Sequence, residues 1–177
     1  QVDYGTGEDF GGLVQEILAD FQPLPGDRRT INAAIHFSES LLRANNNPLA
    51  PRQLAEFLAQ YLQTAQSLQD KRSEAFLLQQ LGQLYAQQQQ WSAAETMTAQ
   101  SLAIAETLNA DDLIAQGGWQ LGRIYQAKHQ TTEAIATYQK AVNALQNLRS
   151  DLVAINTDVQ FNFRDRVEPV YRELVAL

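Results

Sequence analysis

The residues of this chain that could do chemistry are few and scattered. His36 and His129 are the two histidines, and more than two expected helices separate them. Neither has a companion ligand three or four residues away, which a metal site on a helix usually requires. The chain has no cysteine and therefore no thiolate nucleophile, disulfide or cysteine ligand. We expect both histidines at the surface or in turns, and no metal.

Acidic residues give no better case for catalysis. Glu8-Asp9 and Asp111-Asp112 are adjacent pairs in turn context, and adjacent side chains on a helix do not face each other. Residues 5–11 have glycines but lack the spacing and the lysine of a phosphate loop, and their carboxylates would repel phosphate. No nucleophile elbow is present. The sequence predicts a protein that is not an enzyme and that needs no cofactor.

The composition of the chain limits the classes of partner that it could bind. Apolar residues make up 45% of the chain, which suffices for a folded core, while the net charge of −7 disfavours nucleic acid. No apolar run approaches the roughly 18 residues that a membrane span requires. The chain starts at Gln1, and its single methionine is Met97, so we expect a piece of a longer product and leave the compartment open.

The first 30 residues are expected to be a lead-in to the main domain. Five of the nine glycines fall here, together with Pro23 and Pro25. One short helix fits between them, because Leu13, Ile17 and Phe21 recur at every fourth residue. The segment is either a linker or packing strap, or the end of another domain.

Helical periodicity dominates the remainder, and no strand pattern occurs, which predicts an all-α domain over residues 31–177. A helix over Thr30–Arg43 should end before residues 45–48, which read Asn-Asn-Asn-Pro. Pro51 suits the first turn of the next helix. The apolar face of that next helix consists of Leu54, Phe57, Leu58, Tyr61, Leu62, Ala65 and Leu68.

Two similar segments lie 40 residues apart. Residues 81–85 read Leu-Gly-Gln-Leu-Tyr and residues 121–125 read Leu-Gly-Arg-Ile-Tyr, followed at the same offset by Ala94 and Ala134. A fixed period of this size is typical of stacked helical repeats. Gly82 and Gly122 would let a neighbouring helix approach closely. Large rings would insert between pairs, and the packing set is Leu81, Gly82, Tyr85, Ala94, Leu121, Gly122, Tyr125, Ala134 and Tyr138.

Helix boundaries follow from local signals. The first helix of the second pair should cover residues 73–86, with a polar break at 87–90. Ser92 and Glu95 fit a capping box for the partner helix. The face of that partner helix is expected to consist of Ala94, Met97, Ser101, Ile104 and Leu108. Asp111 is the expected N-cap of the following helix. A break at 128–130 precedes another helix, and a last helix, kinked at Pro169, should cover residues 158–177.

The pattern resembles the tetratricopeptide repeat, whose helices carry W-x2-L-G-x2-Y and then A-x3-F. Leu78 and Gly118 stand where tryptophan is usual, and Thr98 replaces the aromatic residue that Tyr138 supplies in the other copy. The resemblance implies a right-handed superhelix of antiparallel helix pairs. It divides the chain into a degenerate repeat at 31–74, repeats at 75–114 and 115–154, and the terminal helix. The longer period implies longer second helices.

The same resemblance places the first helix of each pair on a ligand groove. Trp119 and Arg123 are side chains that often dominate binding, although Trp119 could instead fill the space beside Gly117 and Gly118. A lysine/asparagine carboxylate clamp is absent, so a chaperone tail is not expected. The expected ligand is a protein or peptide. The expected groove residues are Phe76, Gln79, Gln83, Gln87, Gln116, Trp119, Arg123 and Gln126.

A second resemblance concerns the C-terminal part of the chain. Residues 161–174, with 148–152 upstream, look like the junction before the caspase-like CHAT domain of bacterial multidomain proteins. That likeness implies the adaptor arm of a larger protein with a C-terminal CHAT domain. The alternative is a rigid spacer or a self-association module. An apolar stripe on the last helix favours the alternative: Val167, Val170, Leu174 and Leu177.

Overall fold

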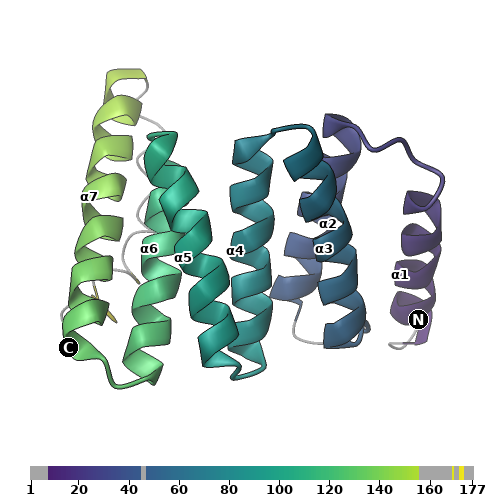
Figure 1. Cartoon of the computed structure of the whole chain (residues 1–177), viewed down its shortest axis with the longest axis horizontal. Coiled ribbons are helices and arrows are strands. Elements are labelled where there is room, and N and C mark those ends of the chain that lie inside the picture. The colour runs from purple at the N-terminus through teal and green to yellow at the C-terminus, as the bar shows by residue number, and fades with distance from the viewer. Residues whose placement is uncertain (1–7, 45–46, 156–168, 170–171, 174–177) are drawn as a thin grey trace, which may run out of the picture.

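The computed structural model describes residues 8–44, 47–155, 169 and 172–173. Every regular element in this part of the chain is an α-helix, which confirms the all-α prediction. The helices lie side by side in a row, with α1 at one end and α7 at the other (Figure 1). Their bounds are α1 Glu8–Phe21, α2 Arg28–Arg43, α3 Pro51–Ser67, α4 Lys71–Gln87, α5 Trp91–Thr107, α6 Asp111–Ala127 and α7 Thr131–Ile155.

Four identical turns set the length of the central helices. Each of α3, α4, α5 and α6 has 17 residues and ends in a turn whose second residue has a positive φ, between 50° and 59°. The next backbone N–H then bonds back to a carbonyl five residues earlier, as from Gln90 to Tyr85 at 2.9 Å. This is the Schellman C-cap. The residues with positive φ are Gln69, Gln89, Asn109 and His129.

These turns correct two boundary predictions. The expected longer second helix occurs in one pair: α7 has 25 residues and α6 has 17, whereas α4 and α5 have 17 each because the turns recur every 20 residues. The capping box is wrong: α5 begins at Trp91 after Gln90, so Ser92 lies inside the first turn. Asp111 is likewise the first helical residue, after Ala110, and no side chain caps α6. Here the Schellman turn, and not a polar cap, determines where the next helix begins.

Packing follows the order of the row. α4 packs along α5, and α6 packs along α7, while α3–α4 and α5–α6 contacts join successive pairs. The first helices of successive pairs also touch, α2 with α4 and α4 with α6. One apolar cluster contains residues of α1, α2, α3 and α4. A second connects α4, α5 and α6 through Ala75, Ala105 and Leu113, and a third lies between α6 and α7. The core is therefore a series of joined layers.

Helix α1 docks on this row by a face that overlaps the expected one: Ile17 and Phe21 are half-buried as part of it, and Leu13 is not. Val14 is buried and Leu18 is half-buried against the core, whereas Leu13 is 51% exposed. Phe21 anchors the end of the helix in an aromatic cluster, with its ring centroid 5.2 Å from that of Phe57 and 5.6 Å from that of Phe37. Edge-to-face and tilted contacts of this kind suit the ring quadrupoles.

The glycines of the repeat lie where helices meet. A Cβ atom on Gly82 would lie 2.3 Å from Thr98 Oγ1, and one on Gly122 would lie 2.7 Å from the ring of Tyr138. Neither distance is possible for a real Cβ, so α5 and α7 can approach α4 and α6 this closely only because glycine stands there. Leu81, Leu121, Ala94, Ala134 and Tyr138 are buried as expected, while Tyr85 and Tyr125 are half-buried.

The predicted face of α5 is wrong in phase. Ala94 and Ser101 are buried, but Met97 and Ile104 are only half-buried, and Leu108 is 41% exposed. The helix instead turns its small side chains towards its neighbours, because Gly82 admits only a small group at the contact. The residues that it buries are Ala94, Thr98, Ser101, Leu102 and Ala105.

Of the predicted last helix, the structure describes only Pro169, Arg172 and Glu173, all in helical conformation. The apolar stripe of Val167, Val170, Leu174 and Leu177 lies outside the described residues. No helix of the described part combines the length and hydropathy that a bilayer crossing needs.

The glycine contacts can be tested with a matched pair of substitutions. Gly122→Ala should lower the free energy of unfolding by about 1–3 kcal/mol, because the new methyl group overpacks against the buried Tyr138 ring. Gly12→Ala, where a Cβ meets nothing within 4 Å, should instead raise it by about 0.5–1 kcal/mol. Urea unfolding followed by circular dichroism measures both. Equal gains in the two variants would show that no close contact exists at Gly122.

The turns offer a second test. Gln89→Gly should stabilise the protein by about 0.5–1 kcal/mol, because glycine adopts positive φ without the steric penalty of a Cβ. Gln100→Gly, at an exposed position within α5, should destabilise it by about 1 kcal/mol. Thermal and urea unfolding compare the two variants. A loss of stability in Gln89→Gly equal to that in Gln100→Gly would contradict the left-handed turn.

Candidate protein-binding face on α4 and α6

The expected groove residues lie on two helices that the structure brings together. α4 carries Phe76, Gln79, Gln83 and Gln87, and α6 carries Gln116, Trp119, Arg123 and Gln126. The Gln79 side-chain Nε2 donates to Gln116 Oε1 at 3.2 Å, which joins the two helices across the face. Gln87 is the exception, because its Nε2 donates to the backbone carbonyl of Leu42 at 2.9 Å. It therefore fastens α4 to α2.

A carboxylate from the C-terminal segment lies on the α6 part of this face. Glu173 Oε2 accepts a hydrogen bond from the Trp119 indole Nε1 at 2.9 Å and another from the Tyr138 hydroxyl at 3.0 Å. Arg123 Nε lies 3.9 Å from the same oxygen, and its guanidinium is 5.6 Å from the Trp119 ring centroid. We call Trp119, Arg123 and Tyr138 the carboxylate site.

Neighbouring helices pack closely against both glycines that precede Trp119. A Cβ on Gly117 would contact Leu102 of α5, and one on Gly118 would contact Thr137 and Ala141 of α7. Trp119 is half-buried against the α6–α7 cluster, and its N–H reaches Glu173.

Tyr138 is the buried member of the site. Its ring lies against Gly122, and its side chain is fully buried. Burial raises the pKa of the phenol well above its ordinary value, and the charge of Glu173 and the hydrogen bond to it add to that shift. Arg123 acts in the opposite direction on this pKa. Tyr138 therefore stays neutral and keeps its proton as a donor to a carboxylate, with Gln126 Oε1 at 3.4 Å as a second acceptor.

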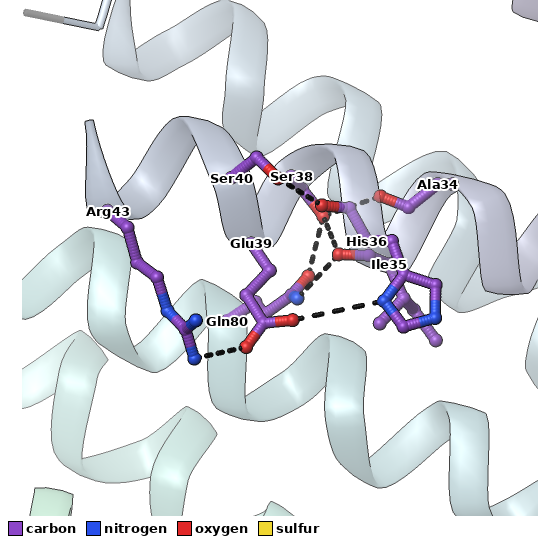
Figure 2. A network of polar contacts seen from close by, with 8 residues as sticks. All are labelled: Ala34, Ile35, His36, Ser38, Glu39, Ser40, Arg43 and Gln80. Carbon is purple, nitrogen blue, oxygen red and sulfur yellow. Dashed lines mark hydrogen bonds and ion pairs between the residues drawn. The ribbon is translucent and has the colours of Figure 1, made fainter.

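Two glutamines that the sequence reasoning missed connect successive pairs: Gln80 is buried and Gln120 is half-buried. Gln80 Nε2 donates to the Ile35 carbonyl of α2 at 2.9 Å, and its Oε1 accepts from the Ser38 hydroxyl at 2.7 Å (Figure 2). Gln120 Nε2 donates to the Gln79 carbonyl of α4 at 3.1 Å and to Thr98 Oγ1 at 2.9 Å. The signal was present, because a glutamine precedes Leu-Gly in both copies.

Residues considered for chemistry take structural positions. His36 is exposed on α2, where Nδ1 lies 3.9 Å from Glu39, which also pairs with Arg43 at 2.6 Å (Figure 2). His129 has positive φ in the turn before α7. In the described residues, no group of three or more His, Asp or Glu side chains gathers at one point.

Of the acidic pairs, Asp112 forms an ion pair with Arg72 of α4, and Asp111 accepts from Asn147 at 3.3 Å. Arg72 also lies over the half-buried Phe76 ring, 5.5 Å from its centroid. The side chains of Glu8 and Asp9 lie outside the described residues. The second pair therefore contributes to packing between helices, and not only to solvation as expected.

Comparison with the models of known protein families finds none that matches this chain, and no curated protein matches it either.

The buried phenol of Tyr138 predicts that the stability of the protein changes at alkaline pH. The pKa of Tyr138 is higher in the folded protein than the value of about 10 in the unfolded chain. Tyr138 therefore contributes its full share to the free energy of unfolding below pH 10. That share is lost as the pH rises towards the pKa of the folded state. Tyr138→Phe should therefore be less stable than the wild type at pH 8, and the difference should shrink above pH 10. Urea unfolding at pH 8, 10 and 11 measures this. A constant difference would refute the shift.

Proposed function

We propose that this chain is a non-enzymatic protein-interaction module, built as a right-handed superhelix of tetratricopeptide type. In this proposal it is the adaptor arm of a larger protein with a C-terminal CHAT domain. The repeat assignment is supported by the 40-residue period, the buried glycines at Gly82 and Gly122, and the contacts of α2 with α4 and of α4 with α6. The CHAT assignment depends on the sequence resemblance around residues 161–174.

One observation carries the binding function. The α6 part of the face already holds a side chain from a segment 54 residues away in sequence, through the Trp119 indole N–H. Hydrogen bonds to a charged group are worth about 1.5–3 kcal/mol each, more than neutral ones. A surface that holds one carboxylate by two directed donors has the chemistry to recognise a protein segment.

The α4 part of the face supplies further polar groups. Gln79 Oε1 is buried and has no hydrogen-bond donor in the described part of the chain. Gln83 is half-buried, and Gln116 is exposed beside Gln79. A buried acceptor without a partner costs about 1–3 kcal/mol, so a bound peptide N–H that reached Gln79 would recover part of that cost.

A rigid spacer is the second candidate, and a different observation favours it. The buried Gln80 amide fixes α4 against α2, and the half-buried Gln120 amide fixes α6 against α4. Arg72 pairs with Asp112 at the N-terminal ends of α4 and α6. Bonds repeated between successive pairs resist bending of the stack. In this reading the face on α4 and α6 needs no ligand in trans.

Partner capture tests the proposed function. The immobilised protein should capture a partner from lysate of its source cells. Trp119→Ala should lose at least about 90% of it, and Arg123→Ala should lose a smaller share, because each removes one group of the carboxylate site. Quantitative mass spectrometry of the bound fraction measures the loss.

The control is Arg52→Ala, which removes an exposed arginine that pairs only with Glu56 on α3. It should capture as much partner as the wild type, and all variants should keep the wild-type circular dichroism. Equal capture by every variant would favour the spacer. For the CHAT assignment, a gene sequence beyond Leu177 that lacks a caspase-like His/Cys domain would contradict the adaptor role.

A further inference from the structure

The carboxylate site on α6 and α7 is built for a single charged group. Its three members come from two helices and converge on one oxygen, Glu173 Oε2, with two hydrogen bonds at 2.9 and 3.0 Å and the Arg123 guanidinium behind them. Tyr138 is fully buried and Trp119 is half-buried, so neither donor needs to be ordered when a ligand arrives. Hydrogen bonds to an ionised carboxylate are stronger than those to a neutral amide oxygen, so this preorganised pair of donors favours glutamate over glutamine.

The position of Glu173 at the surface would allow another carboxylate to replace it. The Glu173 side chain retains 31% of its exposure and the Arg123 side chain retains 62%, so the contact lies at the surface and water reaches it. The carboxylate is therefore held by directed donors without being enclosed. An ion pair with an exposed arginine adds little by itself, and the two hydrogen bonds provide most of the selectivity.

We propose that the carboxylate site is a recognition site for a glutamate side chain of a helical segment in a partner protein, and that Glu173 of this chain occupies it in cis until the partner displaces it. This proposal rests on the proposed interaction function and names its ligand. The occupant that the structure shows defines the ligand class: Glu173 lies in helical conformation, as does Arg172 beside it. The net charge of −7 makes a second acidic protein a poor general partner, so recognition must be local to this site.

Displacement in cis has a measurable consequence. A competitor can bind only those molecules in which Glu173 has left the site. Its apparent affinity is therefore the intrinsic affinity multiplied by the fraction of molecules with an open site. Removing the charge of Glu173 while keeping its size removes the occupant. Glu173→Gln should therefore bind an external glutamate peptide at least about tenfold more tightly than the wild type does.

The probe is a fluorescein-labelled peptide with the sequence of residues 165–177, and the matched control peptide carries glutamine in place of the glutamate at 173. Fluorescence anisotropy gives Kd for each peptide with the full chain. We expect tight binding of the glutamate peptide to Glu173→Gln and at least about tenfold weaker binding to the wild type. Adding Trp119→Phe should remove most of the binding, and adding Arg123→Gln should weaken it by a smaller factor. Glu106→Gln, which removes a glutamate paired with Lys140 at 2.8 Å, should behave as the wild type.

Different results would contradict different parts of the proposal. Equal affinity of the wild type and Glu173→Gln would overturn the occupation in cis, and equal binding of the two peptides would overturn carboxylate recognition. Light scattering is the second measurement: a wild-type dimer that Glu173→Gln converts to a monomer would show that Glu173 acts on a second copy, against the proposal. If these tests fail while partner capture still depends on Trp119 and Arg123, the interaction function stands and only its glutamate ligand is rejected.

Discussion

Side chains of neighbouring helices occupy the space of a missing Cβ at two glycines, and the rest of the arrangement depends on these contacts. At Gly82 the space of a missing Cβ is shared by Thr98 of α5 and Gln120 of α6, while at Gly122 the Tyr138 ring of α7 fills it. The equivalent glycine position is thus filled by different side chains in the two repeats. Threonine is small, so an amide from the next pair completes the contact. Tyrosine is larger, and its hydroxyl reaches Glu173.

Packing and binding are therefore coupled at Gly122. Because the tyrosine ring lies flat against the helix backbone, its hydroxyl has a fixed position and its proton is retained by burial. A flexible surface donor would lose more conformational entropy on binding. The first copy, with Thr98 in the equivalent place, cannot present a hydroxyl in the same way. The two repeats therefore share a scaffold and differ in the chemistry that they display.

Glutamine side chains fix how one pair sits on the next. Gln80 and Gln120 each satisfy a backbone carbonyl of the preceding first helix, and Gln120 also lies beside the glycine contact at Gly82. Apolar surfaces alone would permit sliding, since they attract without direction. A buried amide that loses its partner is costly, so only one register satisfies these groups. The left-handed turns contribute the other constraint, because they give the central helices equal lengths and keep successive glycines in phase.

The sequence by itself determined the features that are local. Apolar periodicity predicted the helices, polar and proline-containing breaks predicted where they end, and the 40-residue period located Gly82 and Gly122 at contacts. It misplaced the caps at Ser92 and Asp111, because backbone turns without glycine leave little trace in composition.

Only the tertiary structure decided the rest. The predicted buried face of α5 included Ser101 but missed Thr98, because threonine does not look apolar, although Thr98 is buried between helices. The sequence pointed to Trp119 and Arg123 but not to their ligand, since Glu173 lies 54 residues beyond Trp119. Which side chains meet across such distances depends on how each helix is rotated and stacked, and that is fixed by contacts that no single segment contains.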